Sequence, residues 1–134
     1  MRVRTLFSSA AFAAALSGCV SDGAGAPSPE ATAQATGASV NCIDPRQISG
    51  RRVASSRALI FEMGGGVTYR NDLLEECPGL GQAPDFKIIQ LDVHGAQVCR
   101  GDTFRAYDPV EAKAVGPQAF PRCRLGAFTP IARR

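Results

Sequence analysis

The sequence predicts a small, mainly β domain, either an antiparallel barrel or a sandwich, with one short helix and disulfide cross-links. Short apolar stretches with strand-like alternation recur at close spacing, separated by turns that contain Gly or Pro. A single short stretch carries a helix start signal. A domain this small buries only about 60–65% of the surface that its unfolded chain exposes, so its core is thin. We therefore expect covalent support from its cysteines.

Residues 1–18 are predicted to be a lipoprotein signal peptide. Arg2 and Arg4 precede a short apolar stretch, and Leu16-Ser17-Gly18-Cys19 resembles the lipobox of bacterial lipoproteins. The apolar stretch is too short to span a bilayer, which takes about 20 residues. Cys19 is then the lipidated first residue of the mature protein. The alternatives are an ordinary signal peptide cleaved after a small residue and an uncleaved anchor.

Residues 19–40 are predicted to hold the lipid anchor and a flexible linker. The segment after Cys19 consists mainly of Ala, Gly, Ser, Thr and Pro, with Asp22 and Glu30 as its charged residues. Such a composition buries too little apolar surface to offset the entropy lost on ordering. The disulfide-bonded β domain is expected to occupy residues 41–134.

The first strands of the domain are predicted on either side of a glycine turn. In residues 58–63, Leu59, Phe61 and Met63 share one face, and residues 67–70 follow Gly64-Gly65-Gly66 as a hairpin partner. Asp72 and Glu75 have the spacing of a capping box, which predicts a short helical turn that starts at Asp72.

The later strands are predicted from alternation and from Gly-containing turns. The stretches are residues 86–93, 98–100, 103–107 and 123–128. A kink is expected at Gly101-Asp102, and the last strand is expected to end before Pro130. Residues 108–118 are interpreted as a surface loop.

The four remaining cysteines are predicted to form two disulfides, since an exported protein reaches a compartment that permits oxidation. Spacing does not choose among the three possible pairings. We expect Cys42 to bond with Cys123, which ties the ends of the domain, and Cys77 with Cys99. A zinc site or a redox pair is disfavoured because the sequence has no Cys-x-x-Cys pair.

The net charge disfavours nucleic acid as a partner. The full chain has a formal charge of +3, and loss of Arg2 and Arg4 leaves 13 basic against 12 acidic residues, or +1. No run of like charge stands out.

Two polar clusters are candidate binding sites. Tyr69 and Arg70 lie where a predicted strand meets the predicted helix, and Arg122 and Arg124 alternate on the last strand, which places both guanidinium groups on one face. Each cluster has an ordinary structural interpretation as core packing, capping or a solvated surface.

No catalytic residue, metal ligand or cofactor is predicted. The single histidine, His94, precedes Gly95 in an expected turn, and Glu75-Glu76 lies on the predicted helix, where charge is normally solvent-exposed. An enzyme that uses carboxylates or His94 is therefore the least favoured interpretation.

Several segments resemble a family of small exported proteobacterial proteins, many of them lipoproteins, that share a domain of unknown function. The segments are Cys42, Leu59-Ile60-Phe61, Tyr69-Arg70-Asn71-Asp72-Leu73, Cys77-Pro78-Gly79-Leu80, Val98-Cys99-Arg100-Gly101-Asp102 and residues 123–131. The resemblance implies an envelope location and a mainly β domain with disulfides. It implies no activity.

The sequence thus favours an envelope lipoprotein whose domain is a non-enzymatic binding or structural module in the periplasm, with a protein or glycan partner. Val20 follows Cys19 where Asp would favour retention in the inner membrane, so we expect the periplasmic face of the outer membrane. The alternative is an inhibitor of an envelope hydrolase, similar to lysozyme-inhibitor lipoproteins. Those proteins tend to present acidic surfaces to basic enzymes, and the mature charge of +1 argues against this alternative.

Overall fold

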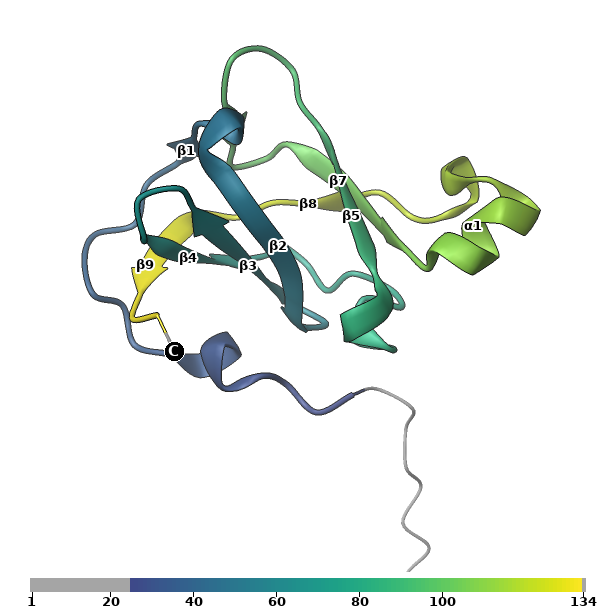
Figure 1. The fold of residues 1–134 in the computed structure, drawn as a ribbon, viewed down its shortest axis with the longest axis horizontal. Helices are drawn as coiled ribbons and strands as arrows, with labels where there is room; N and C mark the ends of the chain where they lie inside the picture. The colour runs from purple at the N-terminus through teal and green to yellow at the C-terminus, as the bar shows by residue number, and fades with distance from the viewer. Residues whose placement is uncertain (1–24, 134) are drawn as a thin grey trace, which may run out of the picture.

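A computed structural model describes residues 25–133 and shows a sandwich-like β domain with one α-helix (Figure 1). Every strand pairing is antiparallel. The elements are β1 (Cys42–Ile43), β2 (Ile48–Ser55), β3 (Ala58–Met63), β4 (Thr68–Asp72), β5 (Ile88–Asp92), β6 (Val98–Cys99), β7 (Thr103–Tyr107), α1 (Pro109–Val115), β8 (Cys123–Arg124) and β9 (Phe128–Ile131). Short 3₁₀ turns occupy Pro29–Thr32, Pro45–Gln47, Pro84–Phe86 and Pro117–Ala119.

The strands form three sheets. A four-stranded sheet has the order β2-β3-β4-β9, a three-stranded sheet has the order β5-β7-β8, and β1 pairs with β6. The predicted fold class is confirmed in its sandwich form, because these sheets do not close into a barrel.

The main core lies between the four-stranded and three-stranded sheets. Leu59 and Phe61 of β3 pack there with Phe104 of β7 and Phe128 of β9, and all four side chains are fully buried. The Phe61 and Phe128 rings meet edge to face with centroids 5.4 Å apart. Burial of large aromatic and aliphatic side chains is the main stabilising contribution in so small a domain.

The β3–β4 hairpin forms at the glycine turn as predicted. Phe61 pairs with Tyr69 across the hairpin, and Gly65 and Gly66 have φ angles of 109° and 90°, which side chains other than Gly rarely adopt. The sequence did not predict β2. Register shifts at Ile48/Gly50 and Val53/Ser55 break its alternation, so its pattern does not have the period of a regular strand.

The prediction of a helix at Asp72 is wrong. Asp72 is the last residue of β4, and its carboxylate accepts a hydrogen bond from Arg70 Nε at 3.0 Å instead of capping a helix. The α-helix lies in the segment predicted to be a loop. Asp108 caps it by accepting from the amides of Val110 and Glu111, and Pro109 occupies the first turn.

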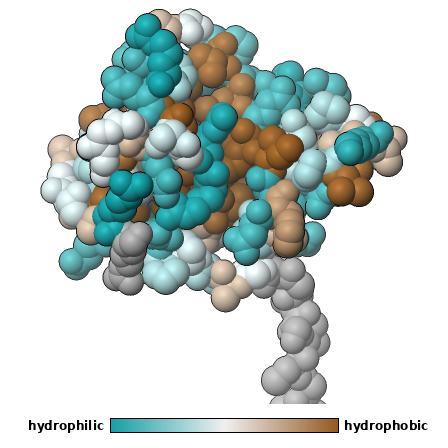
Figure 2. Space-filling view, in the orientation of Figure 1, coloured by the Kyte–Doolittle hydropathy of each residue, from teal (hydrophilic) through white to brown (hydrophobic). Residues whose placement is uncertain are grey.

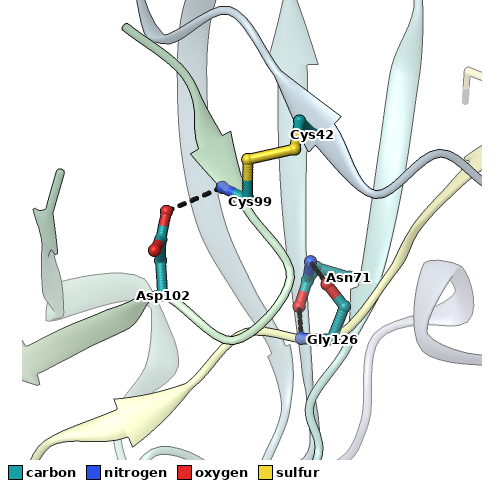
Figure 3. Close-up of a disulfide and its surroundings, with 5 residues drawn as sticks. All are labelled: Cys42, Asn71, Cys99, Asp102 and Gly126. Carbon is teal, nitrogen blue, oxygen red and sulfur yellow. Dashed lines mark hydrogen bonds between the residues drawn. A yellow bond between two sulfur atoms is a disulfide. The ribbon is translucent and has the colours of Figure 1, made fainter. Parts of the chain in front are cut away.

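The predicted last strand, residues 123–128, is also wrong, because it is two strands. β8 ends at Arg124, and β9 begins at Phe128 and continues through Pro130. Between them, the Asn71 side chain donates to the carbonyl of Gly126 and accepts from its amide, both at 2.8 Å (Figure 3). A Cβ at position 126 would lie 1.7 Å from the Asp72 carbonyl oxygen, so this close approach requires glycine.

Both disulfides form, but the predicted pairing is wrong. Cys42 bonds with Cys99, its partner across the β1–β6 pair, and Cys77 bonds with Cys123 of β8. The Asp102 carboxylate accepts from the Cys99 amide at 2.7 Å and fixes the turn beside the first bond (Figure 3). The prediction failed because strand pairing, which sets which cysteines meet, depends on contacts between distant segments.

Residues 25–40, here called the N-terminal strap, pack against the domain, in contrast to the flexible linker predicted there. The strap runs along the free edge of β9, with bridges from Ala35 to Ile131 and from Val40 to Phe128. Ala31 and Ala33 cover the small second core on the outer face of the four-stranded sheet. The domain therefore uses part of the predicted linker as a structural element (Figure 1).

Within residues 25–133, no helix has the length and apolar character needed to cross a lipid bilayer.

Candidate functional site

The outer face of the three-stranded sheet carries a group of polar side chains. On β7, Phe104 and Ala106 pack into or against the core, so the alternation of a strand turns Thr103 and Arg105 to the other face. The register places Asp92 of β5 and Arg124 of β8 on opposite sides of Thr103. We call Asp92, Thr103, Arg105, Arg122 and Arg124 the arginine face.

Asp92 is the shared acceptor of the arginine face. Its carboxylate accepts a hydrogen bond from the Thr103 hydroxyl at 2.9 Å. It also forms ion pairs with Arg105 Nη1 at 3.7 Å and with Arg122 Nε at 3.5 Å. One hydroxyl and two guanidinium groups thus share this carboxylate, and such charge-assisted contacts are the stronger hydrogen bonds of proteins.

Arg105 is the unusual member of this face because its side chain is only 8% exposed. Its Nε atom is buried and has no hydrogen-bond partner among the described residues. A buried charged donor without a partner is costly, so Arg105 is an energetically unfavourable member of this face.

Arg122 and Arg124, predicted to share one face, lie at the open side of this cluster. Arg122 is mostly exposed, and its single ion pair within the described residues is the one to Asp92. Arg124 is exposed and forms no ion pair within that same part of the chain. The face therefore carries three guanidinium groups and one carboxylate, a net positive charge that fits an anionic group.

Tyr69 and Arg70, the other predicted binding pair, have structural roles. The Tyr69 ring packs edge to face on Phe128 with centroids 6.4 Å apart. Arg70 forms an ion pair with Asp72 and donates to the carbonyl of Ala33 in the N-terminal strap. Arg70 therefore uses its donors inside the molecule, and the Tyr69 ring is half-buried against the core.

The residues considered for catalysis are not gathered into one site. His94 is exposed after β5, and Glu75 and Glu76 are exposed in the turns that follow β4. No group of three or more His, Cys, Asp or Glu side chains in residues 25–133 is placed to hold a metal ion. The predicted lipidation site, Cys19, lies outside the described residues.

Sequence reasoning missed Asp92, Thr103 and Arg105. The signal was present, because the alternation of Thr103-Phe104-Arg105-Ala106-Tyr107 puts the polar residues opposite Phe104. The sequence did not show the strand register. This register places Asp92 beside Thr103, and the fold brings Arg122 to the carboxylate of Asp92. That register follows from the packing of the two sheets.

A larger hollow than the surroundings of Asp92 offers lies elsewhere, between the N-terminal strap and Ala132. It has a volume of about 590 Å³, and no charged side chain lines it; the lining residues are Pro29, Thr32, Ala33, Gln34, Ala35, Thr36 and Ala132. It therefore offers little to fix the orientation of a polar ligand.

Comparison with protein-family models, curated proteins and solved structures finds no match to this chain. The resemblance to small exported lipoproteins stays a prediction, and the functional argument is based on the arginine face.

Proposed function

We propose that this protein is a lipid-anchored envelope lipoprotein whose β domain is a non-enzymatic binding module for an anionic partner in the periplasm. The lipobox-like sequence at Cys19 supports the anchor and the envelope location. The periplasmic face of the outer membrane is the expected position. The partner is an envelope protein or glycan that presents carboxylate groups.

The observation that carries the proposal is the arrangement around Asp92. Thr103, Arg105 and Arg122 already converge on one carboxylate, while the exposed Arg124 forms no ion pair within the described residues. A ligand carboxylate at this face would meet the exposed guanidinium groups of Arg122 and Arg124. Arginine suits this role because its planar group binds carboxylates through two donors.

The experiment is crosslinking in cells that express the full-length lipoprotein, followed by affinity capture and mass spectrometry. A parallel assay measures co-sedimentation with purified peptidoglycan. We expect the Arg122→Ala/Arg124→Ala variant to lose most of the captured partner or of the sedimented protein, because these two residues are the exposed guanidinium groups of the arginine face.

The matched control is Arg57→Ala/Arg133→Ala, which removes the same charge from exposed positions outside the arginine face. A Cys19→Ser variant tests dependence on the anchor. Equal binding by the two double variants would show that the arginine face is not the recognition surface. If no envelope protein is enriched over the Cys19→Ser control and no peptidoglycan is bound, the binding-module proposal is wrong.

A further inference from the structure

Two strand edges border an open groove at the front of the molecule. β2 and β5 are each the last strand of their sheet, and no backbone hydrogen bond joins them in the described structure. The groove has a volume of about 310 Å³ and is lined by residues 48–51 and 87–89. Figure 1 shows the two strands side by side, with β2 in blue and β5 in green. We call this feature the edge groove.

Unpaired strand edges present backbone donors and acceptors that can pair with another extended chain. The backbone bonds that connect β2 to segments other than β3 are confined to its far end, where Ser28 donates to the Ala54 carbonyl. The part of β2 that borders the groove, together with β5, is therefore available for strand addition.

The side chains of the edge groove are basic and apolar. Arg51 pairs across the sheet with the core residue Phe61, so it lies on the core-facing side of β2 where the sandwich is open. Arg51 on one wall and Lys87 on the other form no ion pair within residues 25–133, and no acidic residue lines the groove. Figure 2 shows hydrophobic surface over β5 beside hydrophilic side chains over β2, and Ile88 is 44% exposed.

We propose that the edge groove binds an extended acidic segment of a partner protein by strand addition. The backbone of the segment would pair with the free edge of β5 or β2, and its carboxylates would meet Arg51 and Lys87. This surface is distinct from the arginine face, which lies on the outer side of β5, β7 and β8. The inference goes beyond the proposed function and does not depend on it.

The same features have a competing explanation. Inward-pointing cations and bulges, such as the register shift at Ile48/Gly50, also protect sheet edges from aggregation. Both explanations predict that basic and neutral strands are rejected. They differ for an acidic strand, which strand addition accepts and simple edge protection does not.

The test uses the chain with Cys19→Ser and its disulfides formed, titrated with a short capped peptide of alternating threonine and glutamate. We expect amide hydrogen exchange at residues 48–51 or at residues 88–92 to slow about tenfold near saturation, because pairing removes the groups of that edge from water. A threonine–lysine peptide of equal length should have no effect. An acidic peptide with an N-methylated backbone should also fail, because it keeps the charge and lacks the donors.

Variants locate the site. Arg51→Glu/Lys87→Glu should weaken binding of the acidic peptide by more than about tenfold, which is 1.4 kcal/mol. Arg57→Glu/Lys113→Glu, which reverses the same charge at exposed positions elsewhere, should not. Binding that survives in Arg122→Ala/Arg124→Ala separates this site from the arginine face.

Three results would overturn the inference. The first is no protection by the acidic peptide at millimolar concentration. The second is equal binding of the N-methylated peptide, which would indicate charge attraction without strand pairing. The third is unchanged binding of the acidic peptide by the Arg51→Glu/Lys87→Glu variant, measured on a variant whose thermal unfolding midpoint matches that of the parent chain.

Discussion

Asn71 and Gly126 connect the end of β4 to the crossing between β8 and β9. The Asn71 side chain is fully buried and satisfies both the amide and the carbonyl of Gly126. A buried backbone group that loses its partner pays its full desolvation cost, so this small contact has a large effect. One amide side chain thereby fixes where the last part of the chain turns.

We predict that Asn71→Ala destabilises the domain by about 3 kcal/mol, because it leaves two buried backbone groups unpaired. The measurement is the denaturation midpoint in urea with an unchanged slope. Asn41→Ala is the matched control, since the Asn41 side chain is exposed. If Asn71→Ala lowers the free energy of unfolding by no more than Asn41→Ala does, the prediction is wrong.

At the scale of elements, the N-terminal strap is attached mainly by polar contacts to strands that belong to the four-stranded sheet. Glu30 forms an ion pair with Arg52 of β2, and Arg70 of β4 donates to the Ala33 carbonyl. The amides of Ser28 and Thr36 bond to the carbonyls of Ala54 and Pro130. The strap therefore covers the outer face through few and separable interactions, so we expect it to detach before the core unfolds.

The pKa of Glu30 gives the strap a pH dependence. Burial alone would raise this pKa, but the hydrogen bond and charge of Arg52 outweigh it and lower the pKa below its ordinary value of 4.5. Because the folded-state pKa is depressed, the stabilisation is complete above the unfolded-state pKa and is lost as pH falls through the folded-state pKa.

We predict that lowering the pH below about 4.5 reduces the protection of the Ser28 and Thr36 amides before the core amides of β3 are affected. Hydrogen exchange corrected for intrinsic rates measures this. Glu30→Gln should show the same loss at neutral pH, and Glu75→Gln, an exposed control, should not. Simultaneous loss of strap and core protection would mean that the strap is not a separate unit.

At the scale of the whole molecule, one disulfide reinforces an existing strand pair and the other connects parts that the sheets leave separate. Cys42–Cys99 joins the short β1–β6 pair, and Cys77–Cys123 joins the segment after β4 to β8 of the three-stranded sheet. The cysteines of the bonds are 57 and 46 residues apart, so each closes a long loop in the unfolded chain. A domain with so thin a core gains much of its stability in this way.

We predict that replacing either cysteine pair by serine lowers the unfolding free energy by about 4 kcal/mol, and that replacing both prevents stable folding. Guanidinium denaturation of the variants measures the loss. Mass spectrometry of unreduced proteolytic fragments checks the pairing. A fragment that links Cys42 to Cys123 would contradict the arrangement described above.

The sequence by itself determined the class of the fold and some of its local elements, the β3–β4 hairpin above all. Alternation in residues 58–63 places Leu59, Phe61 and Met63 toward one core, and the glycines that follow require a turn; both depend on neighbours in the chain. One short helix was predicted, but it was placed at Asp72 and not at Asp108. Both aspartates have the character of a helix cap, and the ion pair that occupies Asp72 with Arg70 cannot be seen in the sequence.

Only the tertiary structure decided which distant segments meet. The cysteine pairing, the path of the strap along β9 and the convergence of Thr103, Arg105 and Arg122 on Asp92 all depend on strand register. Register is set by burial of whole sheet faces, since a shift of one residue would turn every core side chain outward. That cooperative constraint belongs to the assembled sandwich, so local sequence patterns do not contain it.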